Sequence, residues 1–329
     1  MSKSFKASKL IGVTGAALGA FGGVSYLTFR EVMHRNAKLP PVISALAMKA
    51  MDKDAPAAPA EPDERAVWFE QQHFEEYTIE NDRGFKLKGY LLPAQKPSDV
   101  FVFGSHGYRN HAKGEFNYMA KFYHDKGYNV FLVDHQAAGE SEGTYIGFGY
   151  YEYKDCLKWL GFMLETFGKD IQIILHGVSM GSATVMLMSS DPSLPENVKF
   201  TVADCGYTSA WNEFKSVLKG AHVPAFPLLE GADFFNKKIG GYRFKDADAL
   251  ESVANAKLPM LFIHGSTDTF VPTYMATQLY HACSSEYKDL LIVEGAWHAE
   301  SYRKDSAAYE GKICEFADKF IKVKQEAKK

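Results

Sequence analysis

A serine framed by two glycines lies near the middle of this 329-residue chain, in the pentapeptide Gly177-Val-Ser-Met-Gly181. The apolar, β-branched run over residues 171–175 predicts a strand buried on both faces, and residues 182–188 predict a buried helix. A Gly-x-Ser-x-Gly turn between a strand and a helix exposes the serine hydroxyl at the positive end of the helix. The chemistry that this arrangement favours is nucleophilic attack by Ser179, which needs a base, an acid and an oxyanion-binding site from elsewhere in the chain.

The segments around this serine alternate between predicted strands and helices. A hairpin is predicted to start the domain, with strands over 74–80 and 85–92 joined by a turn at Asn81-Asp-Arg-Gly84. Further buried strands are predicted over residues 100–104, 128–133, 200–203, 260–265 and 290–293. Helices are predicted over residues 115–126, 150–167, 272–282 and 309–323. This alternation predicts an α/β fold with a mostly parallel, doubly wound sheet, in which functional residues gather at the carboxyl ends of the strands.

The ends of the predicted strands present a serine, an aspartate and a histidine in that chain order. Ser179, Asp268 and His298 each come shortly after a strand. We expect Ser179 to be the nucleophile, His298 the base, and Asp268 the acid that orients the histidine. Asp204 also follows a strand and is the rival acid, but the His264-Gly-Ser-Thr-Asp268 context favours Asp268.

Residues from about 74 to 322 resemble a serine hydrolase of the α/β-hydrolase superfamily. They are most similar to bacterial, membrane-associated members of its carboxylesterase and prolyl-oligopeptidase-like branch. The motifs that carry the resemblance are Ser105-His-Gly-Tyr108, Gly177-Val-Ser-Met-Gly181, residues 263–272 and Gly295-Ala-Trp-His298. The resemblance implies the α/β-hydrolase fold and an oxyanion hole made by the backbone N–H groups of Tyr108 and Met180. Residues 134–141 depart from the family pattern, in a loop that is structural in the family.

No clean strand is predicted between residues 207 and 257, which we interpret as a small helical cap inserted over the strand ends. Its aromatic residues favour an apolar acyl or aryl substrate group, and Tyr207, Trp211 and Trp297 are the candidate substrate contacts. The predicted function is hydrolysis of carboxylic esters of small or apolar groups through an acyl-enzyme. A peptidase or amidase of the prolyl-oligopeptidase-like type and a non-catalytic, membrane-tethered binding protein of the same fold are the alternatives.

The N-terminal residues suggest a membrane segment. Residues 10–29 form a run of 20 without a charge, after Lys3, Lys6 and Lys9. This length predicts an uncleaved, single-pass anchor in the cell membrane, with the catalytic domain expected on the extracellular side. Basic residues on both flanks leave the charge rule for orientation undecided. A cleaved secretory signal and a peripheral helix with a cytoplasmic enzyme are the competing interpretations.

The expected organisation is an anchor over residues 1–30, a juxtamembrane segment and Pro/Ala linker over 31–66, and a hydrolase domain over 67–329 with its cap at about 207–257. A hydrophobic content of 46% is ample for a core, and a net charge of −3 gives no reason to expect a nucleic-acid partner. Four widely spaced cysteines predict neither a disulfide framework nor a metal site. We expect no cofactor, a small-molecule ester or acyl substrate, and no defined oligomeric state from the sequence.

Overall fold

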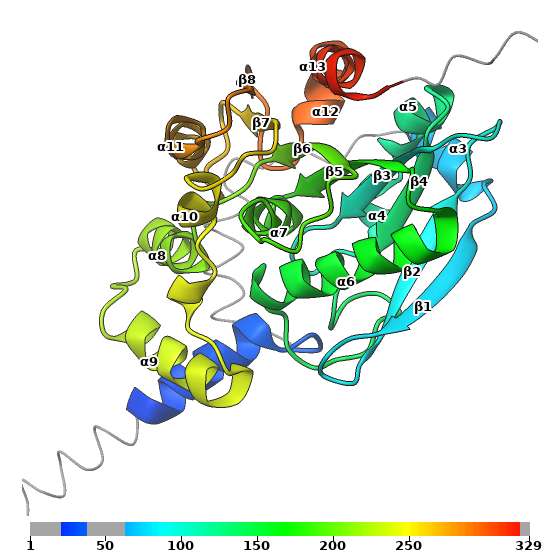
Figure 1. Ribbon diagram of the computed structural model, residues 1–329. Helices are drawn as coiled ribbons and strands as arrows, with labels where there is room; N and C mark the ends of the chain where they lie inside the picture. The colour runs from blue at the N-terminus through cyan, green and yellow to red at the C-terminus, as the bar shows by residue number, and fades with distance from the viewer. Residues whose placement is uncertain (1–20, 38–62, 323–329) are drawn as a thin grey trace, which may run out of the picture.

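The computed structural model describes residues 21–37 and 63–322 and is built on one eight-stranded sheet (Figure 1). The strands run in the order β1-β2-β4-β3-β5-β6-β7-β8. β2 is antiparallel to both of its neighbours, β1 and β4, and all the pairings from β4 to β8 are parallel. The bounds of the strands are β1 Glu75–Glu80, β2 Lys86–Leu92, β3 Val100–Ser105, β4 Asn129–Val133, β5 Gln172–Val178, β6 Val198–Asp204, β7 Met260–Gly265 and β8 Lys288–Val293.

Helices cover both faces of this sheet (Figure 1). Their bounds are α3 Glu64–Glu70, α4 Ala112–Phe116, α5 Ala120–Asp125, α6 Tyr150–Phe167, α7 Met180–Met188, α8 Ala210–Gly220, α9 Leu228–Phe235, α10 Ala249–Val253, α11 Tyr274–Ala282, α12 Ser301–Lys304 and α13 Ser306–Phe320. A π-helical turn at Asn236–Gly240 and a 3₁₀ turn at Phe244–Asp246 follow α9. The predicted mostly parallel sheet, with its starting hairpin and a helical insertion between β6 and β7, is confirmed.

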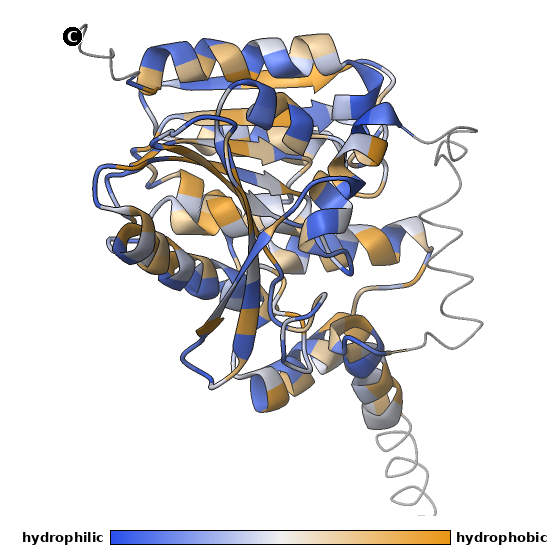
Figure 2. Cartoon of the chain, turned by 90° about the vertical axis from the view of Figure 1, so that its right-hand side faces the viewer, coloured by the Kyte–Doolittle hydropathy of each residue, from blue (hydrophilic) through white to orange (hydrophobic). Residues whose placement is uncertain are grey.

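The core forms because neighbouring residues of each buried strand point to opposite faces of the sheet. In β3, for example, Phe103 packs on the side of α6 and α7, whereas Val102 packs with α4, α5 and α13. The β5 strand is buried at every position, as a central parallel strand requires. In Figure 2 several flanking helices alternate between hydrophilic and hydrophobic residues along their length. In α6 the buried residues, among them Cys156, Trp159, Leu160 and Met163, recur at the spacing of one helical face.

One predicted helix is divided. The helix expected over residues 115–126 is two short helices, α4 and α5, separated by residues 117–119. The His111 side chain accepts a hydrogen bond from the Gly114 N–H and starts α4 early, at Ala112. Gly114 and Asn117 have low helix propensity, which favours a short α4.

The prediction of a membrane-spanning anchor over residues 10–29, and with it the predicted cell-membrane location, is wrong. None of the helices in the described residues is long and apolar enough to cross a membrane. Residues 21–29 belong instead to a helix over residues 21–33, here called the N-terminal helix, which packs against the domain. Its residues Ser25, Phe29 and Met33, spaced by four, form a buried stripe. Residues 10–20 and most of the predicted linker lie outside the described residues.

The packing of the N-terminal helix makes a testable difference between two of its side chains. Phe29 is 1% exposed and Leu27 is 44% exposed. We expect Phe29→Ala to lower the free energy of unfolding by about 3 kcal/mol, because it removes a buried ring and leaves a cavity. Leu27→Ala, the matched control, should change it by less than about 0.5 kcal/mol. Urea denaturation followed by circular dichroism measures both, and equal effects would show that the helix does not pack on the domain.

Candidate active site

Ser179 lies in the sharp turn between β5 and α7, with a φ of 56° and a ψ of −116°. A Cβ atom on Gly177 would lie 2.1 Å from the Gly181 carbonyl oxygen, and one on Gly181 would lie 1.9 Å from the Ser105 carbonyl oxygen. Only glycine therefore fits at either position, which is the physical reason for the spacing in the sequence. The Ser179 N–H donates to the Asp204 carbonyl oxygen at 2.8 Å and ties the turn to β6.

Two further strand ends bring His298 and Asp268 to this serine. His298 Nε2 lies 2.8 Å from Ser179 Oγ, and His298 Nδ1 lies 2.8 Å from Asp268 Oδ2. Asp268 follows β7, and its Oδ1 accepts hydrogen bonds from the N–H groups of Phe270 and Val271. The structure thus joins the three residues predicted as nucleophile, base and acid in one continuous chain of hydrogen bonds.

Burial and neighbouring charges have opposite effects on the pKa values of Asp268 and His298. Burial alone would raise the pKa of Asp268, but the neighbouring His298 and His264 outweigh it and lower that pKa to about 2. Burial alone would lower the pKa of His298, but the Asp268 carboxylate outweighs it and raises the pKa of the imidazole above its ordinary value. The Asp268 carboxylate is therefore ionised at neutral pH and stabilises a positive charge on His298.

The rival acid, Asp204, lies in a different network. Its Oδ2 accepts a hydrogen bond from the Tyr309 hydroxyl at 2.9 Å, and the same hydroxyl lies 2.8 Å from His176 Nε2. Burial raises the pKa of Asp204 to about 7, against the smaller effect of the Tyr309 bond. Asp204 makes no hydrogen bond to His298, so its position below the serine turn favours a structural role.

The loop after β3 passes close to the serine, since a Cβ atom on Gly107 would lie 3.3 Å from Ser179 Cβ. The Gly107 N–H donates to Glu115 Oε2 at 2.8 Å, whereas the Tyr108 N–H has no hydrogen-bond partner among the described residues. Met180 is the first residue of α7, so its N–H has no acceptor within the helix. Neither of these two N–H groups has an acceptor in the part of the chain that the structure describes. Sequence reasoning missed Glu115, which is buried in the last turn of α4.

His106 supports the same loop. Its Nε2 accepts a hydrogen bond from the His135 N–H at 3.0 Å, and the two rings lie 4.4 Å apart. Burial lowers the pKa of His106 to about 4, so the ring is neutral and can accept that bond. The hydrogen bond links the loops that follow β3 and β4.

The three predicted substrate contacts lie in different surroundings. Trp297 is next to His298, with ring centroids 6.1 Å apart. Tyr207 is buried and its hydroxyl donates to the Phe148 carbonyl oxygen at 3.1 Å, which suits a supporting residue. The ring of Trp211 is covered by the Lys245 ammonium at 4.5 Å. Sequence reasoning missed Phe270, whose ring lies 4.9 Å from that of His298.

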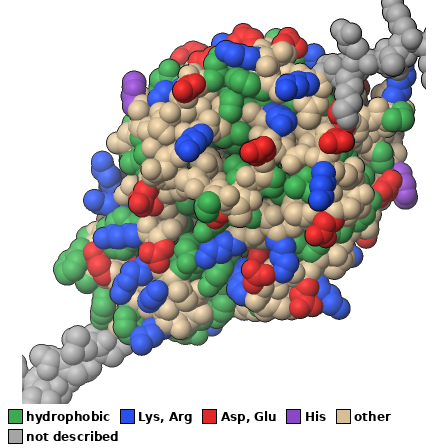
Figure 3. Space-filling model, viewed as in Figure 1, with side chains coloured by type: hydrophobic (Ala, Val, Ile, Leu, Met, Phe, Trp, Pro, Cys, Tyr) green, Lys and Arg blue, Asp and Glu red, His purple; other side chains and the backbone are tan. Residues whose placement is uncertain are grey.

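The described residues also form a depression away from this site. A wide depression of about 990 Å³ lies at the opposite edge of the sheet, at the amino ends of β3, β4 and β5. Within residues 21–37 and 63–322, no group of His, Cys, Asp and Glu side chains is arranged to hold a metal ion. On the face shown in Figure 3, acidic and basic side chains are interspersed rather than gathered into one patch.

The hydrogen bond between His298 and Asp268 predicts a measurable titration. In the wild type, the pKa of His298 should lie above 6.5, and Asp268→Asn should lower it, because the substitution removes the adjacent negative charge. Asp204→Asn should lower it less, since Asp204 acts from a distance. NMR titration of the imidazole C–H signals measures all three proteins, and a larger effect of Asp204→Asn would contradict the pairing.

Comparisons with known proteins agree with this geometry. The model of the family described as serine aminopeptidase, S33, matches residues 96–206. The uncharacterized protein YqkD of Bacillus subtilis is 31% identical over 252 residues, which cover 76% of this chain and 81% of that protein.

Two similar solved structures share the fold. An esterase of Pyrococcus furiosus has a TM-score of 0.63 at 20% identity, with 82% of this chain and 97% of that chain covered. An acylaminoacyl peptidase of Pyrococcus horikoshii has a TM-score of 0.56 at 18% identity, with 82% of this chain and 45% of that chain covered. The resemblance of the sequence motifs to the α/β-hydrolase superfamily is therefore confirmed, and the chain belongs to this superfamily.

Proposed function

We propose that this hydrolase is a serine esterase that cleaves carboxylic esters of small or apolar acyl or aryl groups through an acyl-enzyme. The observation that carries the proposal is the pair of 2.8 Å contacts that join Ser179 Oγ, the His298 ring and Asp268 Oδ2. A serine is a weak nucleophile at neutral pH unless an adjacent base takes its proton. His298 is in contact with the hydroxyl and supplies that base.

Each of these residues has one task in the reaction. Ser179 Oγ attacks the acyl carbonyl carbon while His298 Nε2 accepts its proton. The imidazolium then donates this proton to the leaving alkoxide, so the alcohol departs and the acyl-enzyme remains. Water attacks the acyl-enzyme by the same route in reverse and releases the acid. Asp268 keeps the proton on Nδ1, so that Nε2 faces the serine, and stabilises the imidazolium.

The carbonyl oxygen becomes negatively charged in each tetrahedral intermediate. The N–H groups of Tyr108 and Met180 are the donors that we assign to this oxyanion, and in comparable enzymes each donor is worth about 3–4 kcal/mol. The positive end of α7 acts in the same direction. Glu115 is a positioning residue, because its carboxylate takes the Gly107 N–H and thereby fixes the loop that presents Tyr108.

Two observations favour an ester as the substrate. The cap helices α8 and α9 turn apolar side chains inward, which suits an apolar acyl group, and one of the similar solved structures is an esterase. Amide or peptide hydrolysis is the second candidate, because another of those structures is an acylaminoacyl peptidase. The two activities share the same groups and differ in the leaving group that His298 must protonate.

The first test is covalent labelling. A fluorophosphonate probe should label the wild type and fail to label Ser179→Ala, because the probe reacts only with an activated serine. A p-nitrophenyl butyrate assay should show turnover by the wild type, with at least a 10³-fold loss in His298→Ala. Folded wild-type protein that takes up no label would contradict the proposal, and faster turnover of butyryl p-nitroanilide than of the ester would favour the amidase.

The second test concerns Glu115. Glu115→Ala leaves the Gly107 N–H without its acceptor, so we expect kcat to fall by about tenfold with little change in KM, since the loop acts on the transition state. Glu115→Gln keeps an acceptor oxygen at the same place and should retain most of the rate. Equal losses in the two variants would mean that the charge of Glu115, rather than its hydrogen bond, matters.

A further inference from the structure

A second histidine, His264, contacts the acid of the proposed catalytic group. Its Nε2 lies 3.1 Å from Asp268 Oδ2, the same oxygen that lies 2.8 Å from His298 Nδ1. The side chains of His264 and Asp268 are both fully buried. Burying a polar group costs free energy unless that group finds a partner, so a contact at this depth contributes to holding the two side chains in place.

The strand β7 presents His264 at a position that an apolar residue would ordinarily fill. Side chains two residues apart point to the same face of a strand, so His264 shares its face with Met260 and Phe262, which are both buried. An imidazole in such surroundings needs polar partners. It has two, because Nε2 also lies 2.8 Å from the Val271 carbonyl oxygen.

These two partners determine which nitrogen of His264 carries a proton. A carbonyl oxygen cannot donate, and neither can the Asp268 carboxylate, which is ionised because its pKa is lowered to about 2. A contact between Nε2 and two acceptors is favourable only if Nε2 is protonated. Nδ1 of the same imidazole has no hydrogen-bond partner among the described residues. The proton of Nε2 is therefore shared between the Val271 carbonyl oxygen and Asp268 Oδ2.

The two oxygens of Asp268 are held in different ways. Oδ1 accepts hydrogen bonds from the backbone N–H groups of Phe270 at 3.0 Å and Val271 at 2.9 Å. Oδ2 is in contact with two imidazole nitrogens, one from His264 and one from His298. Val271 connects the two oxygens, because its N–H donates to Oδ1 and its carbonyl oxygen accepts from His264. This closed set of contacts among His264, Asp268 and Val271 is here called the aspartate clamp.

The backbone of the loop that carries Asp268 is fixed to the loop that carries the base. The Ala296 carbonyl oxygen accepts hydrogen bonds from the Thr267 N–H at 3.0 Å and from the Thr267 hydroxyl at 2.9 Å. The Gly295 N–H donates to Ser266 Oγ at 2.8 Å. These bonds set the distance between the two loops. The freedom that remains to Asp268 is rotation of its own side chain, which the aspartate clamp restricts.

Other ionisable groups face the aspartate clamp from neighbouring elements. Asp204 at the end of β6 interacts electrostatically with His264, and both Cys205 and Glu213 of α8 interact with Asp268. Burial raises the pKa of all three groups, to about 7 for Asp204, and so favours their uncharged forms. Asp268 is thus the acid with the strongest preference for its charged form.

We infer that His264 is a positioning residue, whose Nε2–H holds Asp268 Oδ2 where it faces His298 Nδ1. The inference rests on the proposed function, because it assigns His264 a role in the reaction of Ser179. His264 acts through Asp268 rather than on the reacting atoms. If the carboxylate could rotate, the His298 imidazole would lose the partner that keeps Nε2 directed at Ser179, and fewer molecules would be ready to react.

The first test uses the wild type alone and needs no substrate. Long-range proton–nitrogen NMR spectra distinguish protonated from unprotonated nitrogens of each imidazole, and the signals that vanish in His264→Gln identify this residue. We expect Nε2 of His264 to be protonated at neutral pH. An unprotonated Nε2 cannot donate to Asp268 and would overturn the inference, whether or not the protein hydrolyses esters.

The second test compares two substitutions in p-nitrophenyl butyrate hydrolysis. His264→Leu removes the donor, and we expect kcat to fall about tenfold, as for the loss of one hydrogen bond to a charged group, with KM little changed. His264→Gln places an amide N–H near the position of Nε2 and should keep most of the rate.

The pH dependence gives a readout that a general loss of stability would not move. His298 must be unprotonated to accept the Ser179 proton, and the Asp268 charge raises the pKa of His298. A carboxylate that turns away raises it less. The acid limb of kcat/KM should therefore move to lower pH in His264→Leu and stay in place in His264→Gln.

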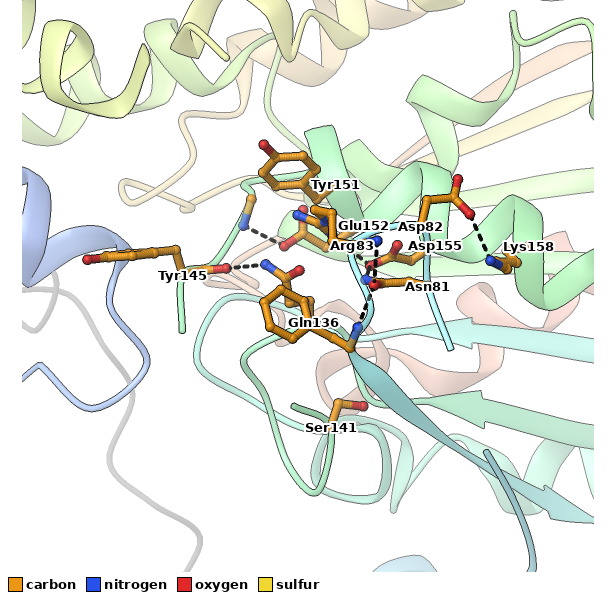
Figure 4. A network of polar contacts seen from close by, with 12 residues as sticks. Asn81, Asp82, Arg83, Gln136, Ser141, Tyr145, Tyr151, Glu152, Asp155 and Lys158 are labelled. Atoms are coloured by element: carbon orange, nitrogen blue, oxygen red, sulfur yellow. Dashed lines mark hydrogen bonds and ion pairs between the residues drawn. The ribbon is translucent and has the colours of Figure 1, made fainter. Parts of the chain in front are cut away.

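The control is a buried side chain in β1's turn, because β1 is the strand farthest from β7 in the sheet order. Figure 4 shows Asn81 beside Arg83 and Asp155, in a polar network that joins this turn to α6. Asn81 donates to Asp155 Oδ2 at 3.1 Å and accepts from the Arg83 and Phe85 N–H groups. Asn81→Ala should lower the urea midpoint, as His264→Leu does, but leave kcat and the acid limb unchanged.

The outcomes separate the role of His264 from the proposed function. Normal fluorophosphonate labelling of the wild type, with equal kcat and equal acid limbs in His264→Leu and wild type, would overturn the role of His264 alone. The same loss of kcat in Asn81→Ala would also overturn it, because stability would explain the effect. Absence of labelling in folded wild type would overturn the proposed function. If His264→Leu does not fold, the protonation of Nε2 in the wild type decides.

Discussion

The backbone conformation of Ser179 is the constraint on which the rest of the site depends. A φ of 56° is unfavourable for a residue with a side chain, and it is held by the contacts on either side of the turn. Gly177 lets β5 approach α7, and Gly181 lets α7 approach the end of β3. His298 and Asp268 are positioned relative to this serine.

The site is assembled from strand ends whose sequence positions are far apart. The parallel pairing of β3, β5, β6, β7 and β8 sets their carboxyl ends along one edge, so loops from each reach the same place. The buried contacts that join His176, Tyr309 and Asp204 link β5, α13 and β6 beside that edge. The sheet thus provides rigidity, and the loops provide the chemistry.

Much of this arrangement follows from local sequence. Each buried strand is a short apolar run. The predicted bounds of α6, residues 150–167, agree with the structure, because helical periodicity and a closing Gly168 are local signals. The pairing of Ser179, Asp268 and His298 could be predicted from strand ends and chain order. Glu115 could not, because its function depends on a loop contact that leaves no pattern. The N-terminal helix was misinterpreted for the same reason. An uncharged run has the same sequence pattern whether a protein surface or a lipid bilayer covers it. The contacts that distinguish the two, such as the hydrogen bond from Tyr108 to Val32, join residues that are distant in the sequence.

The docking of the N-terminal helix also affects the order in which the molecule is completed during synthesis. Domains fold as they leave the ribosome, from the N-terminus onward, and exposed apolar surface makes incomplete chains prone to aggregation. The buried stripe of Ser25, Phe29 and Met33 is made early, yet its partner Gly231 lies far downstream, in α9. Until α9 has been synthesised, this stripe cannot be fully covered. The N-terminal helix is therefore made early but cannot reach its final place before α9 has been made.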